Sequence, residues 1–332
     1  MQSVPPQVYF DELRKKKVKL VPCKEERVVD AREIKELATE IKEPATNNVV
    51  TTQAYLPKGV SAIGAPGMWS RGVNGNGVLV AVIDTGIGYH PDLQGKVVVR
   101  RVYTGETTSP QNTHGTHVAG TIAANGTIRG VAYGAQLGDY RVLSNSGSGR
   151  IDWIVAAIYD AIRDGCDVIS MSLGGPSDYP PLRAAVQAAY NAGVPIIVAS
   201  GNEGDGNVYT NEYSYPAMYS TTQSIGAVDY NGASTNPAPF TNTNNEVDCC
   251  AQGVNVVSTV PGGNYAYMSG TSMATPHISA AAALIIQQYR QSGRTYTTGN
   301  IYSDLRALSK DVYIPGTDKA TGRGFVTFNP TL

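Results

Sequence analysis

The chain alternates between apolar segments of strand length and segments with a helical period. The apolar segments are residues 78–83, 97–102, 137–142, 168–171, 194–199, 225–228 and 254–257. Two stripes with a helical period lie between them, each closed by a glycine: Ile151, Ile154, Ile158 and Ile162 before Gly165, and Leu182, Val186 and Ala189 before Gly193. This alternation predicts an α/β fold, doubly wound, with a mostly parallel sheet and helices on both faces.

The first 55 residues differ from the rest in charge. Residues 11–43 contain 10 Lys or Arg and 9 Asp or Glu, which is 19 of the 53 charged residues of the chain. Within them, Asp30 is a predicted helix N-cap, and Ile34, Leu37 and Ile41 form one apolar face before Pro44. Residues 45–53 are rich in Thr and Asn and predict a linker. We therefore expect an N-terminal extension over residues 1–55 and a single main domain over residues 56–332.

Bulk composition excludes several classes of protein. The net charge of −1 does not suggest a nucleic-acid partner, and no 18-residue apolar run predicts a membrane span. The first residues contain no apolar stretch typical of a signal peptide, so we expect a cytoplasmic protein. The four cysteines, Cys23, Cys166, Cys249 and Cys250, lack zinc-finger spacing, and we expect reduced thiols, with Cys249 and Cys250 buried.

Three residues whose side chains suit nucleophilic catalysis lie next to predicted strand ends or helix starts. In a parallel sheet, catalytic groups usually lie at the carboxyl ends of the strands. Asp84 ends the apolar segment 78–83, His114 opens a glycine-containing helix start, and Ser272 precedes the helical stretch 279–288. A serine hydroxyl needs a base with a pKa near 7, and a buried carboxylate fixes the tautomer of an imidazole base. We expect Ser272 as nucleophile, His114 as general base and Asp84 as the group that orients the base.

A tetrahedral intermediate also needs hydrogen-bond donors for its oxyanion. Asn202, at another predicted strand end, offers a side-chain amide beside the backbone N–H of Ser272. Each residue alone has a simpler interpretation, as a turn former or helix cap. A zinc site that combines His114 with His90 and His117 is a further alternative, although the chain has no HExxH motif.

Four motifs, in chain order, resemble the signatures of the subtilases, the subtilisin-like serine proteases. They are DTGI from residue 84, HGTHVAG from residue 114, SGN from residue 200 and GTSMATP from residue 270. Segments 202–206, 210–213 and 240–244 further resemble the intracellular subtilisins of Gram-positive bacteria. The resemblance implies a serine endopeptidase of broad specificity that acts on proteins and peptides, needs no cofactor for catalysis and has the Asp84, His114 and Ser272 triad.

The substrate cleft can be predicted from small residues and from the resemblance. Backbone edges free of bulky side chains are expected to pair with an extended peptide, and the resemblance adds the wall and floor of the pocket for the residue before the cut. The residues are Gly147, Ser148, Gly149, Ser172, Leu173, Gly174, Gly175, Ala199, Ser200, Gly201 and, near the floor, Ser214. The pair Tyr215-Pro216 resembles a family site with a cis peptide bond.

The N-terminal extension resembles the segment by which intracellular subtilisins block their own cleft. Leu20, Val21, Pro22 and Cys23 match that motif, with Cys23 in place of an aromatic residue. Pro22 lacks an N–H and fixes φ, which would bend a strand in the cleft away from Ser272. We expect residues 1–50 to act as an inhibitory propeptide of a zymogen; a solvated basic tail is the alternative.

Metal sites and oligomeric state are expected only by resemblance. Asp92 matches a ligand of a tight calcium site, but the loop 124–129 is short for the remaining ligands. Ala217, Tyr219 and Asp229 match a weaker calcium site, and the resemblance implies a homodimer. A peptide-binding pseudoprotease and a transpeptidase or cyclase on the same fold remain alternative functions.

Overall fold

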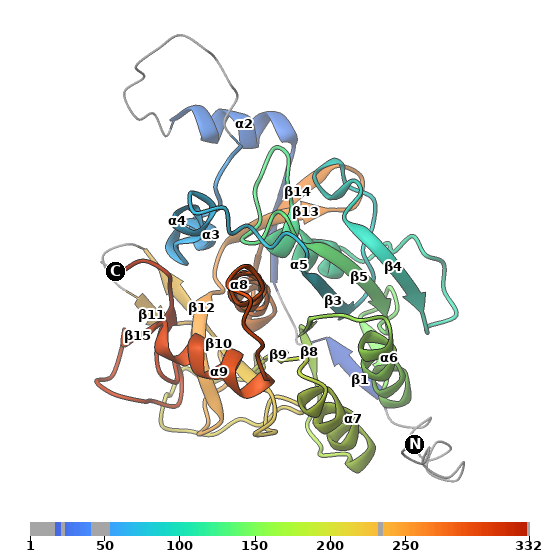
Figure 1. Ribbon diagram of the computed structural model, residues 1–332, viewed down its shortest axis with the longest axis vertical. Coiled ribbons are helices and arrows are strands. Elements are labelled where there is room, and N and C mark those ends of the chain that lie inside the picture. The colour runs from blue at the N-terminus through green and yellow to red at the C-terminus, as the bar shows by residue number, and fades with distance from the viewer. Residues whose placement is uncertain (1–16, 21–23, 41–53, 232–234, 331–332) are drawn as a thin grey trace.

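A parallel sheet runs through the centre of the computed structural model, which describes residues 17–20, 24–40, 54–231 and 235–330 (Figure 1). In this part of the chain the sheet has 10 strands, and all neighbours pair in parallel except β11 and β15. In spatial order they are β4 (Val97–Val102), β5 (Gln136–Arg141), β3 (Leu79–Asp84), β7 (Val168–Met171), β9 (Ile196–Ala199), β10 (Gln223–Tyr230), β12 (Val247–Gln252), β16 (Phe325–Val326) and β15 (Ser309–Lys310), with β11 (Thr235–Pro237) beside β10.

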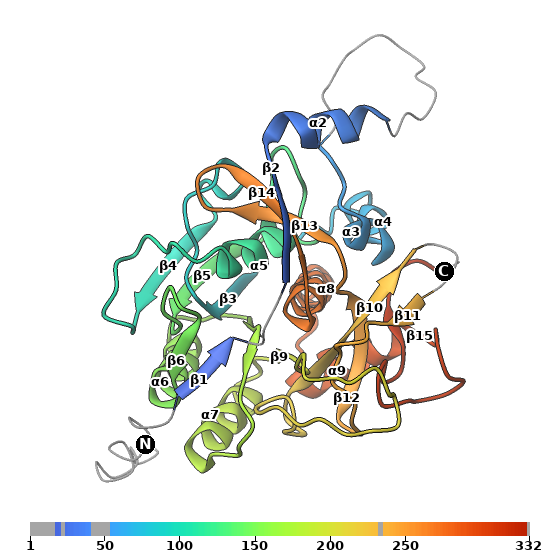
Figure 2. The ribbon, with the colours of Figure 1, turned by 180° about the vertical axis from the view of Figure 1, so that it is seen from behind.

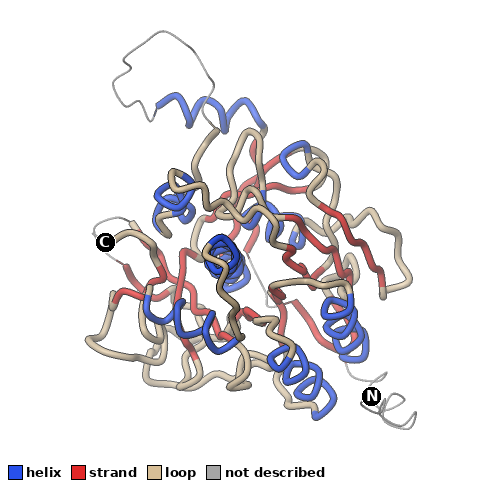
Figure 3. The backbone as a smooth tube through the Cα atoms, in the orientation of Figure 1, coloured by secondary structure: helices blue, strands red, loops and turns tan. Residues whose placement is uncertain are grey.

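Helices cover both faces of the sheet, which explains why its strands are apolar almost throughout. Side chains alternate across β3: Val80 and Val82 join one core cluster with α5 (His114–Ala123) and α8 (Thr271–Gln291). Ala81 and Ile83 join a second cluster on the opposite face, with α6 (Ile151–Arg163) and α7 (Pro180–Asn191). The tube view shows these helices around the sheet (Figure 3). The predicted doubly wound α/β architecture is confirmed.

Shorter elements complete the described residues. They are α3 (Lys58–Ala62), α4 (Ala65–Trp69), the 3₁₀ helix η1 (Pro91–Leu93) and α9 (Thr298–Ala307). The peptide bond between Tyr215 and Pro216 is cis, as the resemblance implies. None of the helices in the described ranges is both long and apolar enough to cross a membrane.

Two small sheets lie outside the central one and both include the N-terminal extension (Figure 2). One consists of β6 (Ser148–Arg150), β1 (Lys17–Leu20) and β8 (Leu173–Gly174), with β1 in the middle. The other consists of β13 (Val256–Val260), β14 (Asn264–Ser269) and β2 (Lys24–Val29), with β2 at one edge. The extension is therefore built into the surface of the catalytic domain through backbone pairing.

A helix follows β2, close to where the sequence predicts one. Helix α2 (Ala31–Glu40) begins after Asp30, whose Oδ1 accepts hydrogen bonds from the backbone N–H groups of Arg32 (2.8 Å) and Glu33 (3.0 Å). These bonds, that to Glu33 above all, lower the pKa of Asp30. Ile34 is fully buried. The predicted N-cap is confirmed, while Ile41, Pro44 and the predicted linker lie outside the described residues.

Sequence reasoning missed β12 and the short strands β11, β15 and β16 of the central sheet. Cys249 and Cys250 were expected to precede a strand at 254–257, but they lie within β12, and the following strand, β13, starts at Val256. Both thiols are fully buried and free, as is Cys166, whereas Cys23 lies outside the described residues. Burial raises the pKa of the Cys249 and Cys250 thiols, which keeps them protonated and unreactive.

Candidate active site

Asp84 and His114 form a buried pair at the carboxyl edge of the sheet. Asp84 is the last residue of β3 and His114 is the first residue of α5. The two carboxylate oxygens lie 2.8 and 3.0 Å from His114 Nδ1, and the backbone N–H of Thr85 donates to Asp84 Oδ1 at 2.6 Å. A carboxylate that holds Nδ1–H leaves Nε2 as the nitrogen that accepts a proton.

Ser272 lies at the start of α8, which packs against α5. Ser172, directly after β7, donates its hydroxyl to the carbonyl oxygen of Ser272 at 2.9 Å. The hydroxyl of Ser272 in turn approaches the carbonyl oxygen of Ser172 at 3.4 Å, a long hydrogen bond. Ser272 is in the first turn of α8, where the helix dipole favours negative charge.

Asn202 is held in a fixed orientation beside Ser272. Its Oδ1 accepts hydrogen bonds from the backbone N–H of Thr271 (2.9 Å) and from the Thr271 hydroxyl (2.8 Å). Nδ2 therefore carries the donor hydrogens of this amide. The preceding Gly201 has φ 116°, and a Cβ there would lie 2.1 Å from Asn242 Nδ2, so the turn that presents Asn202 requires glycine.

The predicted edges of the cleft lie on either side of β1. Strand β1 is antiparallel to both β6 and β8: Val18 pairs with Gly149, Lys19 with Ser148 and Gly174, and Leu20 with Leu173. A Cβ on Gly149 would lie 2.3 Å from the carbonyl oxygen of Val142, so this edge needs a glycine. Gly147 forms the turn before β6. Val21, Pro22 and Cys23 lie outside the described residues.

The expected wall and floor of the pocket lie together. Gly175 and Tyr215 exchange two backbone hydrogen bonds, of 3.0 and 2.7 Å. The hydroxyl of the buried Ser214 is so close to Gly174 that a Cβ on the glycine would lie 2.2 Å from it. Ala199 ends β9, next to β7 in the sheet, and Ser200 and Gly201 follow it. The structure thus brings segments 172–175, 199–201 and 214–215 to one edge of the sheet.

The chain matches the subtilase family over residues 75–321. It is 44% identical over 283 residues to an intracellular serine protease of Paenibacillus polymyxa, which covers 82% of this chain and 85% of that protein. It is 41% identical over 295 residues to the major intracellular serine protease of Bacillus subtilis, which covers 85% of this chain and 90% of that protein.

The chain belongs to the subtilase family. It is therefore a subtilisin-like serine endopeptidase, and its substrates are proteins. Subtilisin E of Bacillus subtilis is also similar, 42% identical over 261 residues. The resemblance inferred from the four motifs is confirmed, while the homodimer stays a prediction.

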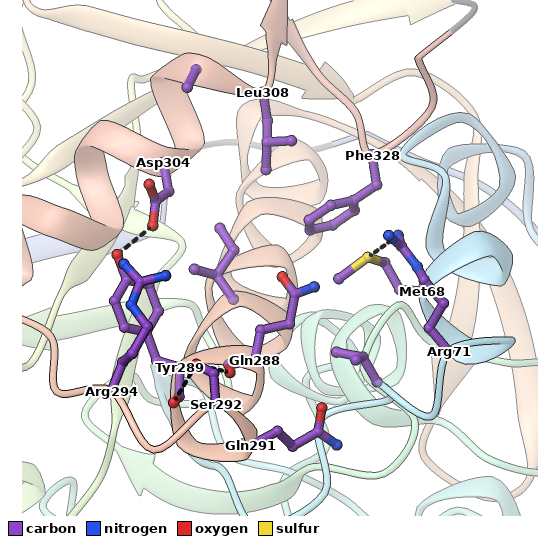
Figure 4. Close-up of a pocket in the computed structure, with 13 residues that line it drawn as sticks. Met68, Arg71, Gln288, Tyr289, Gln291, Ser292, Arg294, Asp304, Leu308 and Phe328 are labelled. Atoms are coloured by element: carbon purple, nitrogen blue, oxygen red, sulfur yellow. Dashed lines mark hydrogen bonds between the residues drawn. The ribbon is translucent and has the colours of Figure 1, made fainter.

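A cavity of about 760 Å³ lies far from the active site of this subtilase (Figure 4). Gln288 and Tyr289, near the end of α8, line it together with Phe328, whereas Ser272 is at the start of the same helix. Its charged groups already contact other protein groups: Arg294 stacks on Tyr289, whose hydroxyl donates to Asp304 at 2.9 Å. We assign no function to this cavity.

The environment of Asp92 does not fit the calcium ion that the resemblance implies. Its two carboxylate oxygens accept backbone N–H groups of Thr127 and Ile128, each at 2.9 Å, and Tyr265 donates its hydroxyl at 3.0 Å. Hydrogen-bond donors of this kind cannot coordinate a cation, and they face the carboxylate where further oxygen ligands would be needed. Asp92 instead fixes the short loop after α5 through hydrogen bonds.

The residues of the expected weaker calcium site also have other contacts. The Tyr219 carbonyl oxygen accepts hydrogen bonds from the Thr222 hydroxyl (2.8 Å) and backbone N–H (2.9 Å). Asp229 lies 3.9 Å from the Lys58 ammonium, which occupies a cation's place beside that carboxylate. Ala217 is buried in the core under α6 and α7. The weaker calcium site stays a prediction.

The alternative zinc site is not favoured by the histidines themselves. His117 Nε2 lies 3.0 Å from the carbonyl oxygens of both Val256 and Ala266, so this nitrogen is engaged within the fold. His90 Nδ1 accepts the backbone N–H of Asp92, and its Nε2 lies 3.0 Å from the carbonyl oxygen of Asn264. In the described part of the chain no three His, Cys, Asp or Glu side chains are arranged to hold a metal.

Sequence reasoning missed a polar network that joins His114 to the turn before β6. Asn145, in the turn before β6, accepts the Asn112 side-chain N–H on its carbonyl oxygen (3.0 Å). Asn112 Oδ1 accepts the backbone N–H of His114 (2.9 Å). The fully buried Arg141 donates to Asn145 and to Glu106. The sequence feature that could have revealed this network is Arg141, a charged residue in the predicted apolar segment 137–142, because a buried charge requires a partner.

Two buried histidines outside the triad predict acid sensitivity. Burial lowers the pKa of His117 to about 3 and that of His277 to about 4. Below pH ~6.5 the two histidines become protonated in the unfolded chain but stay neutral in the folded chain. The free energy of unfolding therefore falls as the pH falls. We expect a loss of roughly 1 kcal/mol per pH unit for each histidine between pH ~6 and ~5.

Urea unfolding of the Ser272→Ala protein at a series of pH values measures this loss without self-digestion. A free energy of unfolding that stays constant between pH ~6.5 and ~5 would contradict the prediction.

Proposed function

We propose that this chain is the zymogen of an intracellular serine endopeptidase whose N-terminal extension occupies its own substrate cleft. The observation that supports this most strongly is the position of β1 between β6 and β8, antiparallel to both. An extended peptide substrate would pair with the same backbone edges. While β1 is there, a substrate cannot enter.

The path of the extension from β1 to β2 supports the same proposal. Leu20 pairs with Leu173, and Lys24 pairs with Ser269. Leu173 adjoins Ser172, which bonds Ser272, and Ser269 precedes Ser272 by three residues. Leu20 and Lys24 are thus both paired with segments close to Ser272 in the sequence or through a hydrogen bond, and residues 21–23 between them lie outside the described residues.

The second half of the extension holds the first half in place. Strand β2 pairs with β14 from Lys24 to Val29, and the side chains of Val29 and Ile34 are buried in the main core cluster. An ion pair between Arg27 and Glu33 joins β2 to α2. Burial of two aliphatic side chains contributes roughly 1.5–3 kcal/mol each. Removal of the extension by a cut in the predicted linker would then open the cleft.

The catalytic steps follow from the geometry of the site. His114 accepts the Ser272 proton on Nε2 as the hydroxyl attacks the scissile carbonyl, and Asp84 stabilises the imidazolium through Nδ1. Nδ2 of Asn202 and the backbone N–H of Ser272 stabilise the oxyanion. His114 then donates its proton to the leaving amine, and water repeats the sequence to release the acid product.

Broad specificity and location inside the cell complete the proposal. The edges of the cleft are backbone groups of Ser148, Gly149, Leu173 and Gly174, which read no particular side chain. The names of the two intracellular relatives support an intracellular site of action.

Removal of the Asn202 amide tests the proposed oxyanion site. We expect Asn202→Ala to lower kcat by about 10²–10³ with little change in KM, the range typical for loss of one oxyanion donor. Thr271→Val is the matched control, because it removes one of the two hydrogen bonds that Asn202 Oδ1 accepts and leaves the amide donor. Steady-state kinetics of the processed enzymes measure both. Equal losses in the two variants would indicate that Asn202 has only a structural part.

A proline in β1 tests the proposed inhibition. Lys19 pairs with Ser148 of β6 and with Gly174 of β8. The variant Lys19→Pro removes the backbone N–H of this residue, whereas the control Lys19→Ala keeps that N–H. We expect the unprocessed Lys19→Pro chain to hydrolyse a short chromogenic peptide roughly tenfold faster than unprocessed wild type. Gel samples taken during the initial rate establish that the extension is still attached. Equal rates for all three chains would contradict inhibition by β1.

A further inference from the structure

Among the described residues, only the extension covers the outer edge of β14. On one side β14 pairs with β13 over Asn264–Met268, and on the other side with β2 over Tyr265–Ser269. In the described part of the chain no other strand pairs with that outer edge. When the extension leaves, a row of backbone N–H and C=O groups becomes available for another strand.

The two strands of the extension lie at different places on the domain: β2 lies beside β14, and β1 lies beside β6 (Figure 2). Strand β1 pairs with residues on one side of Ser272, and β2 pairs with β14 on the other side. We consider a substrate that binds in the same chain direction as the extension. Its residues before the scissile bond then take the place of β1. Its residues after the scissile bond then follow the path of β2.

The far end of the edge accepts an apolar side chain. Val29 pairs with Tyr265 and is 3% exposed, whereas the neighbouring Val28 is 52% exposed. Strand β1 ends at Leu20 and β2 starts at Lys24, so we align the scissile bond of a substrate with the three sequence positions between them; Val29 follows Cys23 by six residues and Val21 by eight. The side chain that replaces Val29 is therefore six to eight residues downstream of the scissile bond.

We propose that the β14 edge of the processed enzyme binds the downstream part of a protein substrate as an added antiparallel strand. The contact reaches the sixth to eighth residue after the cut and favours a small apolar side chain at its far end. This inference rests on the proposed function, because the edge is covered until the extension is removed. The ligand is an unfolded polypeptide segment, recognised mainly through its backbone.

Quenched fluorescent peptides of one upstream sequence and increasing downstream length test the proposal. The enzyme is the active species that forms from the full chain. We expect kcat/KM to rise at least tenfold between three and eight downstream residues, mainly through KM, since several backbone hydrogen bonds are added. An aspartate in place of the far apolar residue should remove much of that gain.

Backbone N-methylation of the eight-residue peptide supplies the matched control. Strand β2 pairs regularly with Tyr265, Ala266 and Tyr267, and the register shifts between Tyr267 and Met268. In the regular part only every second N–H of the peptide faces β14, so methylation there should lower kcat/KM at alternate positions and leave the intervening positions unaffected. A kcat/KM that is independent of downstream length beyond three residues would overturn the inference. Failure to cleave any of the peptides, including the short ones, would instead contradict the proposed function.

Discussion

Burial of both faces of the parallel sheet is the constraint on which the rest of the structure depends. Val80 and Val82 face one core and Ala81 and Ile83 the other, so a polar side chain on β3 is tolerated only at its end, where Asp84 stands. The helices that cover the two faces begin or end at the same edge. His114 at the start of α5 and Ser272 at the start of α8 therefore lie at the carboxyl edge of the sheet, where Asp84 ends β3.

The same backbone edges can serve a substrate and the enzyme's own extension. In the proposed function, β6 and β8 would bind a peptide by backbone hydrogen bonds that any residue except proline can make, so they would discriminate little between substrate and extension. The extension has the advantage of covalent attachment, which raises its effective concentration, and of the apolar contacts of Val29 and Ile34. Cleavage can therefore regulate the proposed zymogen, because a cut removes the covalent attachment of the extension and leaves only its apolar contacts.

The sequence predicts those parts of the fold that depend on local pattern. The run that ends at Asp84, the two helical stripes and the Asp30 cap are all determined by residues close together in the chain. Strands β6 and β8 are three and two residues long and exist as strands because β1 lies between them, which local pattern does not reveal. The hydrogen bonds of Asp92 and the network through Asn145 likewise join residues more than 30 positions apart.

Labelling with a fluorophosphonate probe most directly tests the claim that a competent serine site is covered by the extension. Such a probe reacts with a serine activated by a neighbouring base, and mass spectrometry locates the modified residue. The account predicts rapid labelling of Ser272 after the extension has been cut and labelling at least tenfold slower in the intact chain, since β1 and β2 flank the nucleophile on both sides. Equally rapid labelling of Ser272 in the two forms would contradict it.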